Sequence, residues 1–325
     1  MTYPEIVTYA LDGKGGAEAV ARDSLTRTGQ HDQKTGFVWQ HLKRDHPDTS
    51  ALLVASGLDS FVVDALTADE TRPRCTVHGK GILLNLRGVN LDPGAEPEDM
   101  ISVRLWLESH RVIGVWVRPL QATEDLIRAM ERGEGPDSPG DLVARLALRL
   151  TDRAEPSVTA LNEQIDDLEE AILDPKAEAM RARLADVRRR AIVLRRYFLP
   201  QRDALTTLEI EDARWLNDHD RGRLREAAER VNRFGEELDA IRDRAQIVHD
   251  QIMDQRAEGM NQRMLVLSVV AAIFLPLGLL TGLLGINVGG VPGADNPNAF
   301  AFVCGLIVVI GLALLWWFRR TGMLK

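Results

Sequence analysis

Cysteine and aromatic side chains are scarce in this chain of 325 residues, which has 2 cysteines and 5% aromatic residues. Two cysteines that form no CxxC pair exclude a disulfide framework and a cysteine-rich zinc site. Lys and Arg number 40 against 48 Asp and Glu, and the resulting net charge of −8 argues against nucleic acid as a partner. The HExxH and GxSxG motifs are absent as well, so we expect no enzyme.

Charge is missing altogether from two stretches near the C-terminus. Met264–Leu284 is 21 residues without a charged side chain, and Phe300–Phe318 is 19 more. At 1.5 Å per residue the first stretch reaches about 31 Å, which crosses a bilayer core of roughly 30 Å. The sequence therefore predicts a polar domain followed by two helices that span a lipid bilayer.

The charges that flank these spans predict an orientation. Arg256 and Arg263 precede the first span, and Arg319 and Arg320 follow the second. The segment between the spans contains no Lys or Arg, and the start of the chain does not have the pattern of a signal peptide. By the positive-inside rule we expect a plasma (inner) membrane protein with both termini in the cytosol.

Residue patterning divides the polar part in two. Residues 1–136 mix short β-type runs with modest helices and predict a cytosolic α/β domain with a mostly antiparallel sheet. The expected strands are Phe37–Trp39, Thr76–His78, Ile82–Leu86, Ile101–Leu107 and Val112–Val117. Residues 137–220 predict a helical segment, with helices over 141–153, 157–173 and 176–207.

One long stalk helix is predicted over 221–284, after a turn whose last residue, Asp220, we expect to be its N-cap. This helix would run from the cytosolic segment through the first span. An extracytoplasmic loop at 285–299, a second span at 300–318 and a cytosolic basic tail at 319–325 complete the chain. The predicted fold class is an α+β domain followed by long α-helices and a two-helix transmembrane hairpin.

Two polar signals are interpreted as structural. His41 and His46 lie five residues apart without a third metal ligand, so we expect surface histidines. The basic run Arg188–Arg190 is expected to form ion pairs with the acidic segment 166–170 on a neighbouring helix.

The first span has two unlike faces. Small or mildly polar residues recur on one side: Asn261, Met264, Ser268, Ala271, Leu275, Gly278, Gly282 and Gly285. Bulky residues suited to lipid run opposite them: Val266, Val270, Ile273, Leu277, Leu280 and Leu284. The small stripe contains the GxxxG pattern of helix association, and it can also line a pore. Both interpretations stay open, because a pore helix in a ring also packs on its neighbours.

Electrostatics favours a cation in such a pore. The C-terminal end of the first span carries about half a negative charge and is expected to point outward. The carboxamide of Asn287, just past that end, offers an oxygen to a metal ion or to its bound water. Neither span contains Asp or Glu, so we expect a partly hydrated ion.

The membrane segment resembles a known family. Gly285-Ile286-Asn287 at the end of a first span, a short loop and a second span ending in basic residues are similar to the CorA superfamily, whose signature is Gly-Met-Asn. Residues 261–268 resemble its N-x-x-M-x-x-L-[ST] entry into the first span. Ile286 in place of Met, with the Gly-rich 289–293 after it, resembles the family's zinc transporter branch, ZntB.

The resemblance implies a homopentameric funnel that transports divalent cations, with zinc as the favoured cargo. Magnesium or cobalt transport by the same architecture is the alternative, and a membrane-tethered scaffold or sensor is a further one. No permanently bound cofactor is implied, because Zn²⁺, Mg²⁺ or Co²⁺ would be cargo. Gly278 and Leu265 stand where many relatives have Thr and Lys, which leaves ion selectivity open.

The resemblance also implies roles for single residues. Asn287 would form the outer ring that receives the hydrated ion, and Gly285 and Ile286 would shape this entrance. Met264 and Leu267 would form an apolar constriction near the cytosolic end. The implied pore lining is Asn261, Met264, Leu267, Ser268, Ala271, Leu275, Gly278, Thr281 and Gly282. Which of Leu267 and Ser268 faces inward stays open.

Overall fold

The structure is a computed structural model, which describes residues 5–20, 36–69, 72–171, 177–286 and 296–323. The chain divides into two compact units, Met1–Val248 and His249–Lys325. The strands are β1 (Ile6–Leu11), β2 (Ala17–Ala19), β3 (Phe37–Lys43), β4 (Arg74–His78), β5 (Gly81–Gly88), β6 (Ile101–Glu108) and β7 (Arg111–Trp116). The helices are α1 (Thr49–Ala55), α2 (Ser60–Thr67), α3 (Gln121–Glu131), α4 (Pro139–Glu170), α5 (Ala177–Ile210), α6 (Asp218–Leu284) and α7 (Ala299–Arg320). Helix α6 contributes to both units.

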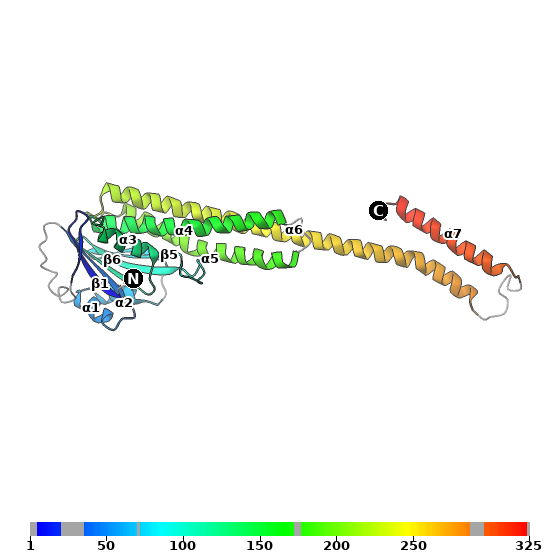
Figure 1. Ribbon diagram of the computed structural model, residues 1–325, viewed down its shortest axis with the longest axis horizontal. Coiled ribbons are helices and arrows are strands. Elements are labelled where there is room, and N and C mark those ends of the chain that lie inside the picture. The colour runs from blue at the N-terminus through cyan, green and yellow to red at the C-terminus, as the bar shows by residue number, and fades with distance from the viewer. Residues whose placement is uncertain (1–4, 21–35, 70–71, 172–176, 287–295, 324–325) are drawn as a thin grey trace. The chain divides into compact units, whose positions relative to one another are not determined.

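The strands form one sheet, which lies at the left of Figure 1. Its strand order is β2-β1-β3-β7-β6-β5-β4. Neighbouring strands are antiparallel except β3 and β7, which are parallel, so the predicted mostly antiparallel sheet is confirmed. Strands β1 and β2 were not predicted. The Ala-Glu-Ala of β2 contains no β-branched or aromatic residue, and such residues are the main local signal of a strand.

Helices cover both faces of the sheet. On one face Leu53 of α1 and Leu66 of α2 are buried together with the strand residues Leu83, Trp106 and Ile113. On the other face α5 contacts β4 and β5, and α4 contacts β5. Strands β5 and β7 are buried along almost their whole length, as is typical of a sheet covered on both sides.

Helix α4 runs unbroken from Pro139 to Glu170, so the prediction of two helices divided near residue 155 is wrong. Pro156 lies inside it, where a proline removes one hydrogen bond and costs about 3 kcal/mol. The ring of Pro156 is on the exposed side of the helix, whereas Ala154 and Val158 are buried. Burial of apolar residues on both sides of the proline offsets this cost and keeps the helix continuous.

Helix α6 begins at Asp218, so the prediction of Asp220 as its N-cap is wrong. Asn217 Oδ1 accepts the Asp220 N–H at 2.9 Å, and the Asp220 carboxylate accepts the Asn217 N–H at 3.4 Å. This reciprocal pair is a capping box, in which Asp220 is the residue in the first turn. The hydroxyl of Ser138, the N-cap of α4, also donates to Asp220 at 3.4 Å, which ties the starts of the two helices together.

The basic run and the acidic segment both form ion pairs, but not with each other, so the predicted pairing is wrong. Arg189 and Arg190 of α5 bind the buried carboxylate of Glu98 at 2.9 and 3.2 Å. In the acidic segment of α4, Glu169 accepts from Arg244 of α6 at 2.7 Å. This hydrogen bond raises the pKa of Arg244 and lowers that of Glu169. Charge runs alone do not reveal which of three long helices lie side by side.

His41 is buried, at 1% exposure, which corrects the prediction of a surface histidine. Its ring centroid lies 5.6 Å from that of Trp116 and 5.2 Å from that of Trp39. Burial lowers the pKa of His41 to about 3. The imidazole is therefore neutral at physiological pH and fills the core as another aromatic ring.

We predict that His41 makes the stability of the first unit depend on pH. Between about pH 6.5 and 3 the unfolded chain protonates this imidazole, whereas the folded chain keeps it neutral. The unfolded state then binds more protons, so stability falls as the pH falls, by about 2 kcal/mol at pH 5. Urea unfolding followed by circular dichroism measures this loss. His41→Phe should reduce the loss of stability at low pH. The matched variant of an exposed histidine, His110→Phe, should not. Equal pH profiles of stability for wild type and His41→Phe would contradict the prediction.

Candidate functional site: an uncovered face of α6

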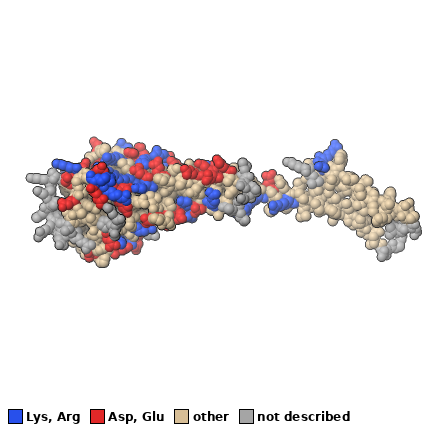
Figure 2. Space-filling model, viewed as in Figure 1, with Lys and Arg blue, Asp and Glu red and all other residues tan. Residues whose placement is uncertain are grey.

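Two helices, α6 and α7, contain stretches long and apolar enough to cross a membrane. In the view of Figure 2 the surface of the second unit carries no charged side chain over most of its length. Arg263 lies just before the apolar part of α6, and Arg319 and Arg320 end α7. A surface of this composition is stable in lipid rather than in water.

Helix α7 covers one face of α6. Val269 is 4% exposed, and Ile273, Leu277 and Leu280 are half-buried on the same stripe. Leu277 Cδ1 lies 3.9 Å from the position that a Cβ on Gly311 of α7 would take. The prediction that Ile273, Leu277 and Leu280 face lipid is therefore wrong. Lipid tails are as apolar as leucine, so the sequence pattern does not distinguish lipid from an apolar helix. Val269 lies four residues before Ile273 and therefore on the same face of the helix, so the sequence pattern could have been used to predict that it belongs to this stripe.

The residues predicted to line a pore lie on the opposite face. At about 100° per residue, the centre of the predicted stripe lies about 180° from the centre of the stripe that α7 covers. Leu267 is 70% exposed and Leu275 is 78% exposed. We call the predicted set the open face, because all its members are exposed: Asn261, Met264, Leu267, Ser268, Ala271, Leu275, Gly278, Thr281 and Gly282.

Two positions on the open face need separate comment. Leu267 and Ser268 lie roughly 50° to either side of its centre, so the geometry still leaves open which of them would face a pore. Thr281 lies at the margin of the face, and its hydroxyl donates to the carbonyl oxygens of Leu277 and Gly278 at 3.0 and 3.1 Å. Because its proton is engaged within the helix, the oxygen of Thr281 is left to accept a hydrogen bond from water.

The GxxxG pair has no close neighbour among the described residues of this chain. A Cβ added to Gly278 or Gly282 would meet no described atom within 4 Å. Close helix association through these glycines would therefore involve another molecule, such as a second copy of the chain.

The predicted entrance follows the end of α6. Gly285 donates its N–H to the carbonyl of Thr281 at 3.0 Å, and Ile286 is 52% exposed. The φ of Gly285 lies outside the left-handed region, so the helix does not end in a left-handed glycine cap. Asn287, to which the resemblance assigns the outer ring, lies outside the described residues.

The open face has few groups that would hold a bare metal ion. No cluster of three or more His, Cys, Asp or Glu suited to a metal occurs anywhere in the described parts of the chain. The polar groups of the open face itself are the Asn261 amide and the hydroxyls of Ser268 and Thr281. Three neutral groups without a carboxylate are too few to replace the hydration shell of a divalent ion, but they can hydrogen-bond to the water around it.

Known proteins share this layout. The family model described as "CorA-like Mg2+ transporter protein" matches residues 34–320. The chain belongs to the CorA-like family. This CorA-like chain is 39% identical over 318 residues to the divalent cation transporter CmaX of Pseudomonas aeruginosa, covering 97% of this chain and 95% of that protein. It is 34% identical over 317 residues to the zinc transport protein ZntB of Yersinia enterocolitica, with the same coverage of 97% and 95%.

A solved structure extends the likeness to three dimensions. The full-length CmaX protein superposes with a TM-score of 0.83 at 37% identity, covering 98% of this chain and 99% of that one. The predicted family and the predicted fold class, an α+β domain followed by long helices and a two-helix hairpin, are thereby confirmed.

We predict that the open face borders water in membranes, so that a cysteine placed on it reacts with a charged, water-soluble thiol reagent. Ala271→Cys should be labelled, whereas Leu277→Cys, on the face against α7, should not. Both variants are made after replacement of Cys304, which is exposed on α7, and of Cys75, whose pKa burial raises to about 12. Equal labelling at the two positions, or none at Ala271→Cys, would contradict a water-lined open face.

Proposed function

We propose that this CorA-like chain carries divalent metal ions across the inner membrane, with zinc as the cargo, through a pore lined by the open faces of five copies of α6. The observation that carries the proposal is that the open face of α6 has no charged residue, consists mostly of small or mildly polar residues, and lies on the opposite side of the helix from the stripe that α7 covers. Two helices cannot enclose an aqueous path. Several copies with α7 on the outside and the open face inside can.

The path of the ion follows from the chemistry of that face. The hydrated ion enters at a ring of Asn287, where the negative ends of the converging α6 helices attract it. It passes Thr281 and the small residues and leaves through the constriction at Met264 and Leu267, with Asn261 at the inner exit. Water stays on the ion throughout, because the face supplies no carboxylate.

The proposed orientation places both termini and the first unit in the cytosol. Basic residues at both cytosolic span ends, including Arg263 and Arg319, support it, as does the absence of Lys and Arg from residues 285–299. The first unit carries most of the acidic residues of a chain with net charge −8. Its acidic helices would gather cations or transmit a gating signal.

The choice of zinc rests on the Ile286 variant of the signature and on the likeness to ZntB. Magnesium or cobalt as cargo is the competing proposal, supported by the description of the matching family. Flux of Zn²⁺, Mg²⁺ and Co²⁺ into liposomes that contain the purified protein separates them. We expect zinc flux to exceed the other two at equal concentrations, and a faster magnesium flux would overturn the choice of zinc.

We predict that Asn287→Ala lowers zinc flux into liposomes at least tenfold, because the entrance loses the amide oxygens that receive the hydrated ion. The matched control is Asn298→Ala, at an exposed asparagine before α7 whose side chain makes no capping hydrogen bond. Its flux should stay within about twofold of wild type. Near-normal zinc flux in a correctly assembled Asn287→Ala protein would reject the entrance role.

A further inference from the structure

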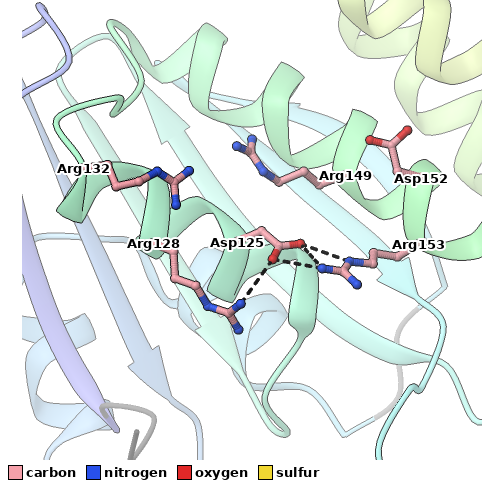
Figure 3. A pocket seen from close by; sticks show the side chains of 6 residues that line it. All are labelled: Asp125, Arg128, Arg132, Arg149, Asp152 and Arg153. Atoms are coloured by element: carbon pink, nitrogen blue, oxygen red, sulfur yellow. Dashed lines mark hydrogen bonds and ion pairs between the residues drawn. The ribbon is translucent and has the colours of Figure 1, made fainter.

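A pocket of about 430 Å³ lies between α3 and α4 in the first unit (Figure 3). Charged side chains line it: Asp125, Arg128, Arg132, Arg149, Asp152 and Arg153. Four guanidinium groups against two carboxylates give this lining a formal charge of +2, in a chain whose net charge is −8. A local excess of positive charge in a hollow attracts anions.

Both carboxylates of the pocket already have arginine partners. Arg153 binds the two oxygens of Asp125 through three hydrogen bonds, of 3.0, 3.0 and 2.7 Å. Asp152 accepts from Arg230 of α6 at 2.7 Å. An anion that enters the pocket therefore meets carboxylates whose charge is largely neutralised.

Of the four arginines that line the pocket, Arg149 is the one that makes no hydrogen bond or ion pair with any described residue. Its guanidinium and that of Arg132 point toward one another from α4 and α3 (Figure 3). Burial, followed by repulsion from Arg145, lowers the pKa of Arg149. An anion between the guanidinium groups of Arg149 and Arg132 would offset the repulsion among these arginines. It would also supply the hydrogen-bond acceptor that Arg149 lacks.

Arg128 and Arg132 have only partners that are easily exchanged. Arg128 binds Glu124 at 2.9 Å and lies 3.9 Å from Asp125, which Arg153 already holds, and Arg132 binds Glu134 at 3.1 Å. Both arginine side chains are more than half exposed, at 56% and 59%. Exposed ion pairs contribute about 0–1 kcal/mol, so both side chains can turn toward a ligand at little cost.

The remaining features of the pocket define the class of ligand. Among the described residues that line it there is no aromatic or apolar side chain, so nothing would stack on a base or cover an acyl chain. Guanidinium groups match phosphate oxygens in geometry and charge, and the pocket is larger than one phosphate group. We propose that this pocket binds the di- or triphosphate group of a small anion through Arg128, Arg132 and Arg149, without recognising a base. The site is independent of the proposed pore.

Isothermal titration calorimetry of the full chain, purified in lipid nanodiscs and in a low-salt buffer freed of metal ions, tests this site. Sodium pyrophosphate should bind saturably, and ATP should bind within about threefold of it, because only the phosphates are recognised. Arg149→Gln should weaken pyrophosphate at least tenfold. Arg128→Gln, on an exposed side chain that folding does not need, should weaken it about threefold or more.

The matched control is Arg188→Gln, which removes one charge from an exposed position on α5. Its pyrophosphate affinity should stay within twofold of wild type. The proposal is overturned if pyrophosphate shows no saturable binding, or if Arg188→Gln weakens it as much as Arg149→Gln does. Binding of ATP without binding of pyrophosphate would overturn it as well, because it would reveal recognition of the base.

Discussion

The architecture of this chain depends on one face of α6 that the described residues leave uncovered. Helix α7 takes the bulky stripe around Val269 and Leu277, and this leaves glycines, Ala271 and a few hydroxyls on the other side, together with the exposed side chains of Met264, Leu267 and Leu275. Small residues gain little from lipid contact and form the surfaces on which membrane helices approach closely. Such a face is stable next to other copies of itself, and a ring of copies that also leaves room for water on its axis becomes a pore.

The first unit fixes where α6 begins. The Asn217–Asp220 capping box sets its first turn, Ser138 ties that turn to the start of α4, and Arg244 binds α4 near its other end. The sheet in turn anchors α4 and α5, since β5 contacts both. Helix α6 continues from this unit into the apolar segment without a break, so a displacement at its N-terminal end can be transmitted along the helix. A gating signal of the kind proposed would act through that continuity.

Sequence alone gave the strongest predictions where one physical rule dominates. Twenty-one uncharged residues specify a span, and short apolar runs between turn residues specify β5 and β6. The sequence Gly285-Ile286-Asn287 at the end of a span indicates the family. Prediction from the sequence failed where the position or partner of a residue depends on which helices and strands become neighbours. The burial of His41, the pairing of Arg190 with Glu98 and the turn of Leu277 toward α7 all depend on tertiary contacts. The arginine pocket was missed for the same reason, since its residues lie on two helices that no local pattern joins.

The most direct test of the account is the number of copies in the assembled protein. Native mass spectrometry of the full chain released from lipid nanodiscs counts them. The open face of each α6 needs neighbours on both sides and a single chain cannot close a path, so the account requires a ring of copies. It predicts five of them, the number implied by the resemblance to the CorA superfamily. A protein that remains monomeric in lipid while it still transports metal would contradict the central claim.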